Sequence, residues 1–311
     1  MAWQSYLGVS YINIMKNIVF IGAGKIGTAI GGALQGKDFC LAFWDKDPSK
    51  VKEIKDLSEL VPTADFLFFC VPSWVLREAV KEVASFIRKD TIVISPSKGI
   101  EIATNKSTDE VLKELLPAGV DFALLSGPML ADEICKGNLA AAVVGTEKVE
   151  VYHKIKELFI GTNLKVEHSA DVHGVALGGI FKNVYALALG MAEGLGWGSN
   201  EKGILVTEAI AEMQEIFKIL GGKPETVLTV AGLGDFIATG FSPCSKNYTA
   251  GLELARDGQA KTMSEGLSSF DSVIKLLSGH LEKFPLLSIL KHIIKDSAPA
   301  SAAFSVWVNS Y

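Results

Sequence analysis

The segment Ile18-Val19-Phe20-Ile21-Gly22-Ala23-Gly24-Lys25-Ile26-Gly27 joins four consecutive apolar residues to a G-x-G-x-x-G motif. The apolar run predicts a buried strand, and the residues after it predict the start of a helix. In that context Gly22 permits a tight turn, Gly24 lets the backbone approach a pyrophosphate, and Gly27 lets the helix pack closely on the strand. The helix N-terminus would then offer free N–H groups to phosphates. The segment predicts a dinucleotide-binding loop, although a glycine-rich turn without a ligand could have the same pattern.

An acidic residue and a lysine follow the second apolar run. Asp45 and Lys46 come directly after the strand expected at Phe39–Trp44. A carboxylate at this place suits the ribose 2′-hydroxyl of NAD, whereas a cation suits the 2′-phosphate of NADP. Because a carboxylate would repel a phosphate, Asp45 favours NAD slightly. Both cofactors stay open, and Asp45 could also be an ordinary turn residue.

Short apolar runs alternate with amphipathic stretches from residue 15 to about 165. Near-continuous apolar strands alternating with helices predict a parallel sheet covered by helices on both faces. We therefore expect an α/β fold, with a Rossmann-type, doubly wound parallel sheet as the dinucleotide-binding domain at residues 15–168. Strands are expected at residues 17–22, 39–44, 66–71, 91–95, 122–126 and 140–145, and helices at 26–35, 74–86 and 109–116.

The pattern changes after residue 170, where no further strand is expected. Helical stretches at 171–195, 200–220, 223–231, 246–257, 264–278 and 284–295 predict an all-helical C-terminal, substrate-binding domain at residues 169–311, with the boundary near Lys165–Ser169. The Ala- and Ser-rich residues 297–311 favour a partly irregular tail. Met15-Lys16-Asn17 resembles a natural start, so we interpret residues 1–14 as a leader of little structural consequence.

The composition excludes several classes of protein. With 311 residues, 49% hydrophobic and 21% charged, the chain can bury a sizeable core. A formal net charge of −5 gives no general basic surface to attract nucleic acid. The four cysteines form no C-x-x-C pair and the five histidines have no metal-ligand spacing, so we expect free, buried thiols and no metal site. No apolar run reaches the roughly 18 residues of a membrane span, and residues 1–14 lack the features of a signal peptide, which favours a cytoplasmic protein.

Several unusual segments lie where a doubly wound sheet binds its ligands, or in the helical half. Ser97-Lys98-Gly99-Ile100-Glu101 and Ser126-Gly127-Pro128 follow expected strands. The helical half contains Leu177-Gly178-Gly179-Ile180-Phe181-Lys182-Asn183, then Gly232-Leu233-Gly234-Asp235, then Ser245-Lys246-Asn247. In this order, from Met15 to about Leu290, the motifs resemble those of the soluble NAD(P)-dependent glycerol-3-phosphate dehydrogenases.

The resemblance implies three catalytic residues. Lys182 matches the lysine that exchanges a proton with the substrate oxygen at C2. Lys98 matches a lysine that reaches both substrate and nicotinamide, and Asp235 matches a carboxylate that orients the substrate and the catalytic lysine. The implied substrate contacts are Lys98, Gly127, Lys182, Asp235, Ser245, Lys246 and Asn247, of which the triplet 245–247 holds the phosphate. Together with Gly22, Gly24, Gly27 and Asp45, which the glycine loop and the second strand already suggested, the implied cofactor contacts are Lys25, Ile26, Lys46, Lys98, Ala131, Lys246, Met263 and Glu265.

The residues themselves make Lys182 a reasonable acid and base. A lysine normally titrates near 10.4, and burial in an apolar helix together with the like charge of Lys98 would lower its pKa. Asp235 would act in the opposite direction. Alternatively Lys182 extends to water, Lys98 is a loop lysine, Asp235 is a helix N-cap and residues 245–247 are a polar loop. We interpret His173 as an N-terminal helix residue rather than a base, because it lies at the start of the long helix expected at residues 171–195.

Three departures from the family pattern bear on the substrate. Lys246 stands where arginine is usual, Ala176 where a carboxylate is common and Met129 where a small polar residue is common. Lysine contacts a phosphate as a point charge, whereas arginine contacts it as a planar fork. The resemblance implies reversible reduction of dihydroxyacetone phosphate to sn-glycerol 3-phosphate, supplying glycerophospholipid synthesis. A reductase of a non-phosphorylated keto acid (ketopantoate or 3-hydroxyacid type) and a catalytically weak NAD(H)-binding protein remain alternatives, and a homodimer is left open.

Overall fold

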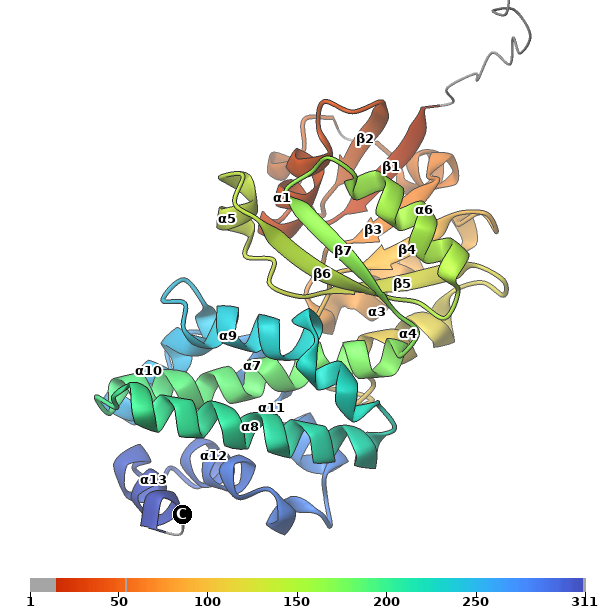
Figure 1. Cartoon of the computed structure of the whole chain (residues 1–311). Helices are drawn as coiled ribbons and strands as arrows, with labels where there is room; N and C mark the ends of the chain where they lie inside the picture. The colour runs from red at the N-terminus through yellow and green to blue at the C-terminus, as the bar shows by residue number, and fades with distance from the viewer. Residues whose placement is uncertain (1–14, 54, 310–311) are drawn as a thin grey trace, which may run out of the picture.

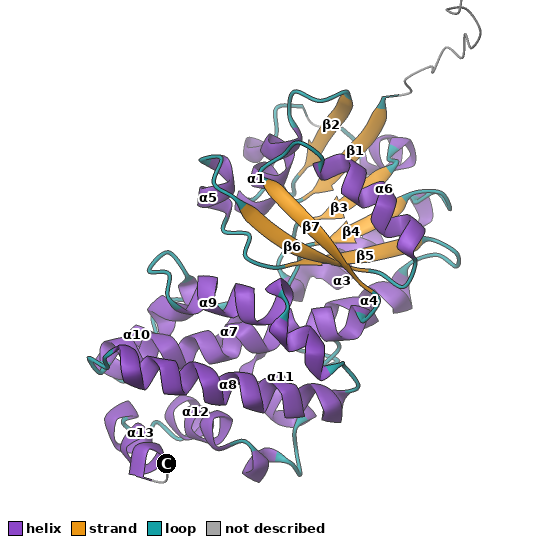
Figure 2. Cartoon of the chain, in the orientation of Figure 1, coloured by secondary structure: helices purple, strands orange, loops and turns teal. Residues whose placement is uncertain are grey.

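A sheet domain and a helical domain follow one another along the chain (Figure 1). The computed structural model describes residues 15–53 and 55–309, so the expected leader at residues 1–14 lies outside the described residues. All strands of the described chain belong to one sheet, in the order β2-β1-β3-β4-β5-β6-β7. Their bounds are β1 Lys16–Ile21, β2 Phe39–Trp44, β3 Phe66–Phe69, β4 Ile92–Ser95, β5 Asp121–Ser126, β6 Ala140–Gly145 and β7 Leu164–Ser169. The predicted fold class, α/β followed by a helical domain, is confirmed (Figure 2).

Helices cover both faces of the sheet because successive strand residues point to opposite sides. Ile18 and Phe20 of β1 pack with helices α1, α5 and α6 on one face. Val19 and Ile21 pack with α2, α3 and α4 on the other face, where the start of the helical domain joins the same core. The bounds of these helices are α1 Lys25–Leu34, α2 Leu57–Leu60, α3 Ser73–Val83, α4 Thr108–Leu115, α5 Ala131–Cys135 and α6 Val149–Phe159.

Two expectations about the sheet are wrong. Strand β6 runs antiparallel to β5, so the sheet is not parallel throughout. Residues 127–139, which link the two strands, form only the short helix α5, and an antiparallel pair does not need a long crossover. Strand β7 was not expected, because it alternates apolar and exposed polar residues at the edge of the sheet rather than forming a continuous apolar run.

Helix α7, Val172–Gly194, forms the centre of the helical domain. Every residue from Gly174 to Ala192 is buried, and the glycines allow close contact, since a Cβ on Gly190 would meet the backbone of Tyr248 in α10. By length and composition α7 could cross a membrane, but its apolar window is wholly enclosed by the protein, which identifies a core helix. The surrounding helices are α8 Ser199–Leu220, α9 Asp235–Gly240, α10 Lys246–Asp257, α11 Glu265–Leu276, α12 Pro285–Lys295 and α13 Ala300–Asn309.

Three further expectations need correction. The helix expected at residues 223–231 is a 3₁₀ turn at Pro224–Leu228 followed by a π-helical turn at Val230–Gly234. The tail is more regular than expected, because Phe304 and Trp307 of α13 pack on Trp197. The four cysteines are free, but only Cys70 is buried; the exposed ones include Cys40, which lies on the edge strand β2.

Candidate active site

The glycine loop has the geometry that a dinucleotide requires. Gly22 adopts φ +102°, and a Cβ there would meet the carbonyl of Cys70 at 2.5 Å. A Cβ on Gly27 would collide with the carbonyl of Gly22, whereas the space beside Gly24 is open to 4 Å. Glycine is therefore needed for the turn and for helix packing, and the backbone at Gly24 can be approached closely. These features fit a dinucleotide whose pyrophosphate lies at the N-terminus of α1.

The Asp45 carboxylate turns back to the glycine loop. Its Oδ2 accepts a hydrogen bond from the Ala23 N–H at 2.9 Å, and its Oδ1 accepts from the Asp47 N–H and lies 3.3 Å from the Lys50 ammonium. Lys46 is exposed beside it. A carboxylate and an exposed ammonium thus lie together at the end of β2, and the expected contacts to a cofactor ribose remain predictions.

Lys98, Asp235 and Lys182 meet at the junction of the two domains. The Lys98 ammonium donates to Asp235 Oδ2 at 2.7 Å and to the carbonyl of Gly127 at 2.9 Å. The Lys182 ammonium lies 3.2 Å from Asp235 Oδ1. Lys98 comes from the loop after β4, Lys182 from the middle of α7, and Asp235 begins α9 directly after the π-helical turn. The structure therefore brings together the three side chains that the sequence nominated for catalysis.

Thr239 completes the surroundings of the Lys182 ammonium. Its hydroxyl lies 2.7 Å from Lys182 Nζ and 3.3 Å from Asp235 Oδ1. Thr239 was not expected at this site, although it lies four residues after Asp235 and so on the same side of a helix. That spacing was the available signal.

The cluster has the charges that proton transfer needs. Lys182 is 6% exposed and Asp235 2% exposed. Burial lowers the pKa of Lys182 to about 8, with the Lys98 charge acting in the same direction and Asp235 opposing both. Burial alone would raise the pKa of Asp235, but the ammonium groups of Lys182 and Lys98 hold it below its ordinary value. At neutral pH the cluster can hold a carboxylate beside an ammonium that releases its proton about two pH units more readily than a free lysine.

The triplet 245–247 is linked to helix α7 through Asn183, the residue after Lys182. Asn247 Nδ2 donates to Asn183 Oδ1 at 2.7 Å, and Asn247 Oδ1 accepts from the Gly266 N–H at 2.9 Å. Asn183 follows Lys182 on α7, so Asn247 of the triplet is tied to the helix that carries Lys182. Ser245 caps α10 through the Tyr248 N–H, as the polar-loop alternative expected, and Lys246 is exposed.

Glu265 lies between the two domains. Its carboxylate accepts a hydrogen bond of 2.9 Å from the Ser73 hydroxyl at the start of α3. Burial raises the pKa of Glu265 to about 7, while Ser73, Lys182 and Lys246 act to lower it. The other expected cofactor contacts are less enclosed: Met263 is exposed, and Ala131 begins α5. The Lys25 ammonium faces Asp132 at 3.5 Å on the surface.

The sequence and the structure both match known proteins. The family model for the N-terminus of NAD-dependent glycerol-3-phosphate dehydrogenase matches residues 46–152, and the model for its C-terminus matches residues 171–305. The glycerol-3-phosphate dehydrogenase (NAD(P)+) of Clostridium perfringens is 34% identical over 283 residues, which are 84% of this chain and 84% of that protein. The chain belongs to this family.

Two further relatives agree with this assignment. The protein of the same name from Ectopseudomonas mendocina is 34% identical over 89% of this chain and 84% of its own length. A glycerol-3-phosphate dehydrogenase from Coxiella burnetii, solved by crystallography, superposes with a TM-score of 0.83 at 26% identity, over 94% of this chain and 99% of that one. The family assignment covers both domains, so it favours the first of the three functions considered from the sequence.

His173 has a partner that the sequence did not reveal. Its Nδ1 lies 2.9 Å from Asp109 Oδ2, which comes from α4 in the sheet domain. The hydrogen bond to Asp109 raises the pKa of His173. As expected, His173 lies in the first turn of α7 rather than in the Lys182 cluster, but its ring links the two domains.

Proposed function

We propose that this chain interconverts dihydroxyacetone phosphate and sn-glycerol 3-phosphate with NAD(P)H. The proposal rests chiefly on one observation: the buried Lys182 ammonium shares Asp235 with Lys98 at the domain junction. A triose phosphate needs a proton donor at the C2 oxygen and a cation to polarise the carbonyl. Lys182 and Lys98 supply these two groups from opposite domains.

Each residue of the cluster has a separate part in the proposed reaction. Lys182 donates a proton to the C2 oxygen during reduction and accepts it during oxidation. A pKa of about 8 suits both directions near neutral pH, because the donor and acceptor forms are then both accessible. Lys98 polarises the carbonyl, and Asp235 with Thr239 holds the Lys182 ammonium in place. The nicotinamide, when bound, supplies or accepts the hydride at C2.

The remaining expected contacts divide between the domains. We propose residues 15–168 as the dinucleotide-binding domain and residues 169–311 as the substrate domain. In the first, the loop at Gly22–Gly27 and the Asp45–Lys46 pair hold the cofactor, with Ala131 nearby. In the second, Ser245, Lys246 and Asn247 form a phosphate site, which Gly127 faces from the sheet domain. Met263 and Glu265, also in the second domain, approach the cofactor. The proposed compartment is the cytoplasm, with supply of glycerophospholipid synthesis as the role.

Parallel assays with NADH and NADPH test this proposal. Purified protein should oxidise at least one of them when dihydroxyacetone phosphate is added, and should not do so with unphosphorylated dihydroxyacetone. Turnover with a non-phosphorylated keto acid, together with none on the triose phosphate, would instead establish the related reductase. Tight NADH binding without turnover on either substrate would identify a catalytically weak binding protein. Light scattering of the same sample shows whether the protein is a homodimer.

A further inference from the structure

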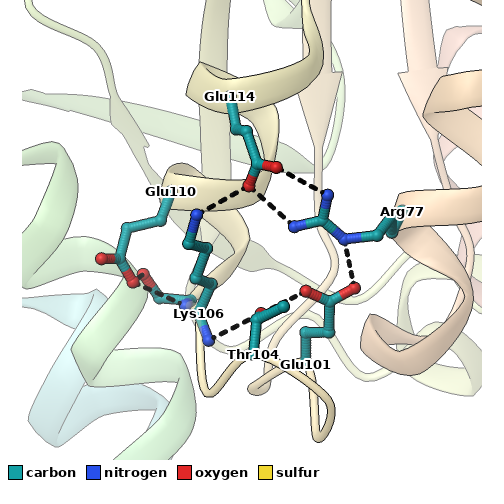
Figure 3. Close-up of polar contacts among 7 residues, drawn as sticks. Arg77, Glu101, Thr104, Lys106, Glu110 and Glu114 are labelled. Carbon is teal, nitrogen blue, oxygen red and sulfur yellow. Dashed lines mark hydrogen bonds and ion pairs between the residues drawn. The ribbon is translucent and has the colours of Figure 1, made fainter.

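The loop that carries Lys98 is held by a connected group of ion pairs, which we call the Arg77 cluster: Arg77, Glu101, Thr104, Lys106 and Glu114 (Figure 3). The Arg77 Nε lies 2.5 Å from Glu101 Oε1. Its two terminal nitrogens donate to the two oxygens of Glu114 at 2.9 and 2.8 Å. Lys106 also contacts Glu114, at 2.8 Å, and Thr104 donates to the second oxygen of Glu101. Each of the three guanidinium nitrogens of Arg77 donates a hydrogen bond to a carboxylate.

The Arg77–Glu101 pair within this cluster is more enclosed than an ordinary surface ion pair, whereas the side chains of Lys106 and Glu114 are more exposed. The side chain of Arg77 is 13% exposed and that of Glu101 10% exposed. Fork-to-carboxylate pairs are geometrically specific, and water screens an enclosed pair less than an exposed one. Hydrogen bonds from Arg77 and Lys106 lower the pKa of Glu114 to about 2, so the cluster stays ionised throughout the neutral range. Arg77 therefore fixes the position of Glu101.

Glu101 is joined to Lys98 by a short and constrained backbone. Gly99 has φ +145°, and a Cβ there would collide with the side chains of Ser73 and Glu265. Ile100 is 1% exposed and belongs to the core of the helical domain, while its backbone pairs with Ser107. Because Gly99 and Ile100 are both held in place, a displacement of the Glu101 backbone would be passed on to Lys98.

We propose that Arg77 is a positioning residue, which acts through Glu101 to hold the Lys98 ammonium against Asp235 and beside Lys182. This inference rests on the proposed function, because it gives Lys98 a part in turnover. Removing the guanidinium would leave the enclosed Glu101 carboxylate without its cation. The carboxylate would then turn to water and draw the Lys98 loop with it.

Arg77→Met, compared with Arg88→Met, tests this proposal. Arg88 also joins two carboxylates, Asp65 and Asp90, but it has no contact with the Lys98 loop among the residues described. With dihydroxyacetone phosphate and the preferred cofactor, Arg77→Met should lower kcat by about tenfold to a hundredfold, since misplacement by about 1 Å is enough for such a loss. The Kd for the cofactor should stay unchanged. Arg88→Met should keep kcat within about twofold of wild type, even where it lowers the melting temperature.

The pH dependence of kcat is a measurement that a purely structural role of Arg77 would not change. The Lys98 charge helps to lower the pKa of Lys182, whereas Asp235 raises it. When Lys98 moves away, the kinetic pKa assigned to Lys182 should rise in Arg77→Met and stay in place in Arg88→Met. Arg77→Lys, which keeps a charge but not the fork, should recover part of kcat.

A double-mutant cycle and a labelling experiment complete the test. In a Lys98→Met background, Arg77→Met should cause no further loss of kcat, because both changes remove the same ammonium. Losses that multiply would overturn the proposal. An amine-reactive reagent, read by mass spectrometry, should modify Lys98 faster in Arg77→Met than in wild type. That measurement needs no turnover, so unchanged labelling would overturn the positioning role, whereas an inactive wild type would overturn only the proposed function.

Discussion

Among the buried polar side chains of helix α7, Lys182 and Tyr185 lie three residues apart, and each meets a buried carboxylate from another helix. Lys182 faces Asp235, which also contacts the Lys98 ammonium. Tyr185 donates a hydrogen bond of 2.6 Å to Glu212 of α8. Glu212 in turn accepts from the backbone N–H groups of Leu286 and Leu287, at 2.6 and 3.1 Å, and so caps α12.

The pKa values of the two carboxylates are shifted in opposite directions. Two ammonium groups hold the pKa of Asp235 below its ordinary value despite burial. Burial raises the pKa of Glu212 to about 7, although three hydrogen bonds act to lower it. Neutral donors satisfy the oxygens of a buried carboxylate but do not balance its charge, whereas cations do. The Asp235 region therefore keeps a carboxylate charged beside two ammonium groups, as the proposed reaction requires, and the Glu212 region joins three helices.

Replacing Lys182 should have the largest effect. Lys182→Ala removes the proton donor, so kcat should fall by about a hundredfold or more, while the Kd for the cofactor changes little. Tyr185→Phe, one turn further on the same helix, is the control and should keep near-normal turnover. Steady-state kinetics and cofactor fluorescence measure both quantities. Near-normal turnover by Lys182→Ala would remove this residue from the proposed role.

Asp235→Asn should affect stability and the pH profile together. It leaves the buried Lys182 ammonium and the half-buried Lys98 ammonium without their counter-charge, which costs on the order of 3 kcal/mol in the free energy of unfolding. Because Asp235 raises the pKa of Lys182, the kinetic pKa of that lysine should fall. Chemical denaturation and the pH dependence of kcat check the two effects. A kinetic pKa that rises would show that Asp235 does not stabilise the charged lysine.

Glu212→Gln should change how stability depends on pH. The pKa of Glu212 is higher in the folded protein than in the unfolded chain, so the folded state binds more protons between about pH 4.5 and 7. Wild-type stability relative to Glu212→Gln should therefore fall on the order of 3 kcal/mol as pH rises across this range, then level off. Urea denaturation at pH 5 and pH 8 provides the comparison. Parallel curves for the two proteins would contradict the raised pKa.

His173→Ala should have the smallest effect. The hydrogen bond to Asp109 raises the pKa of His173, so its contribution is complete below the unfolded pKa of about 6.5 and is lost as pH rises through the folded pKa. We expect a loss of about 1 kcal/mol below pH 6 and less above pH 8. Thermal denaturation at the two pH values measures it, with His292→Ala, a surface histidine, as the control. An equal loss at both pH values would show that the charge of His173 is unimportant.

The sequence alone was informative where function depends on residue type at fixed spacing. The glycines at 22, 24 and 27 occupy positions where a Cβ would collide or close the approach to the backbone, so their spacing predicts the loop directly. The motifs around Lys98, Lys182 and Asp235 likewise identified three side chains that meet within hydrogen-bonding distance. Local chemistry explains the glycine loop, because that motif lies within a single turn, whereas the three side chains were implied by the resemblance of their motifs to those of a known family.

Other features depend on contacts between distant segments. Three contacts join residues at least 24 positions apart in the sequence: Thr239 with Lys182, Asp109 with His173, and Arg77 with Glu101 of the Lys98 loop. The direction of β6 is set by its antiparallel pairing with β5, and β7 alternates apolar and polar residues, so neither feature was evident from an apolar run. Residue types and spacings thus predicted the fold class, and the family resemblance nominated the side chains proposed to react. Only the tertiary structure decided which charges face one another in the interior. It thereby set the pKa values, because a pKa depends on burial and neighbouring charge rather than on position in the chain.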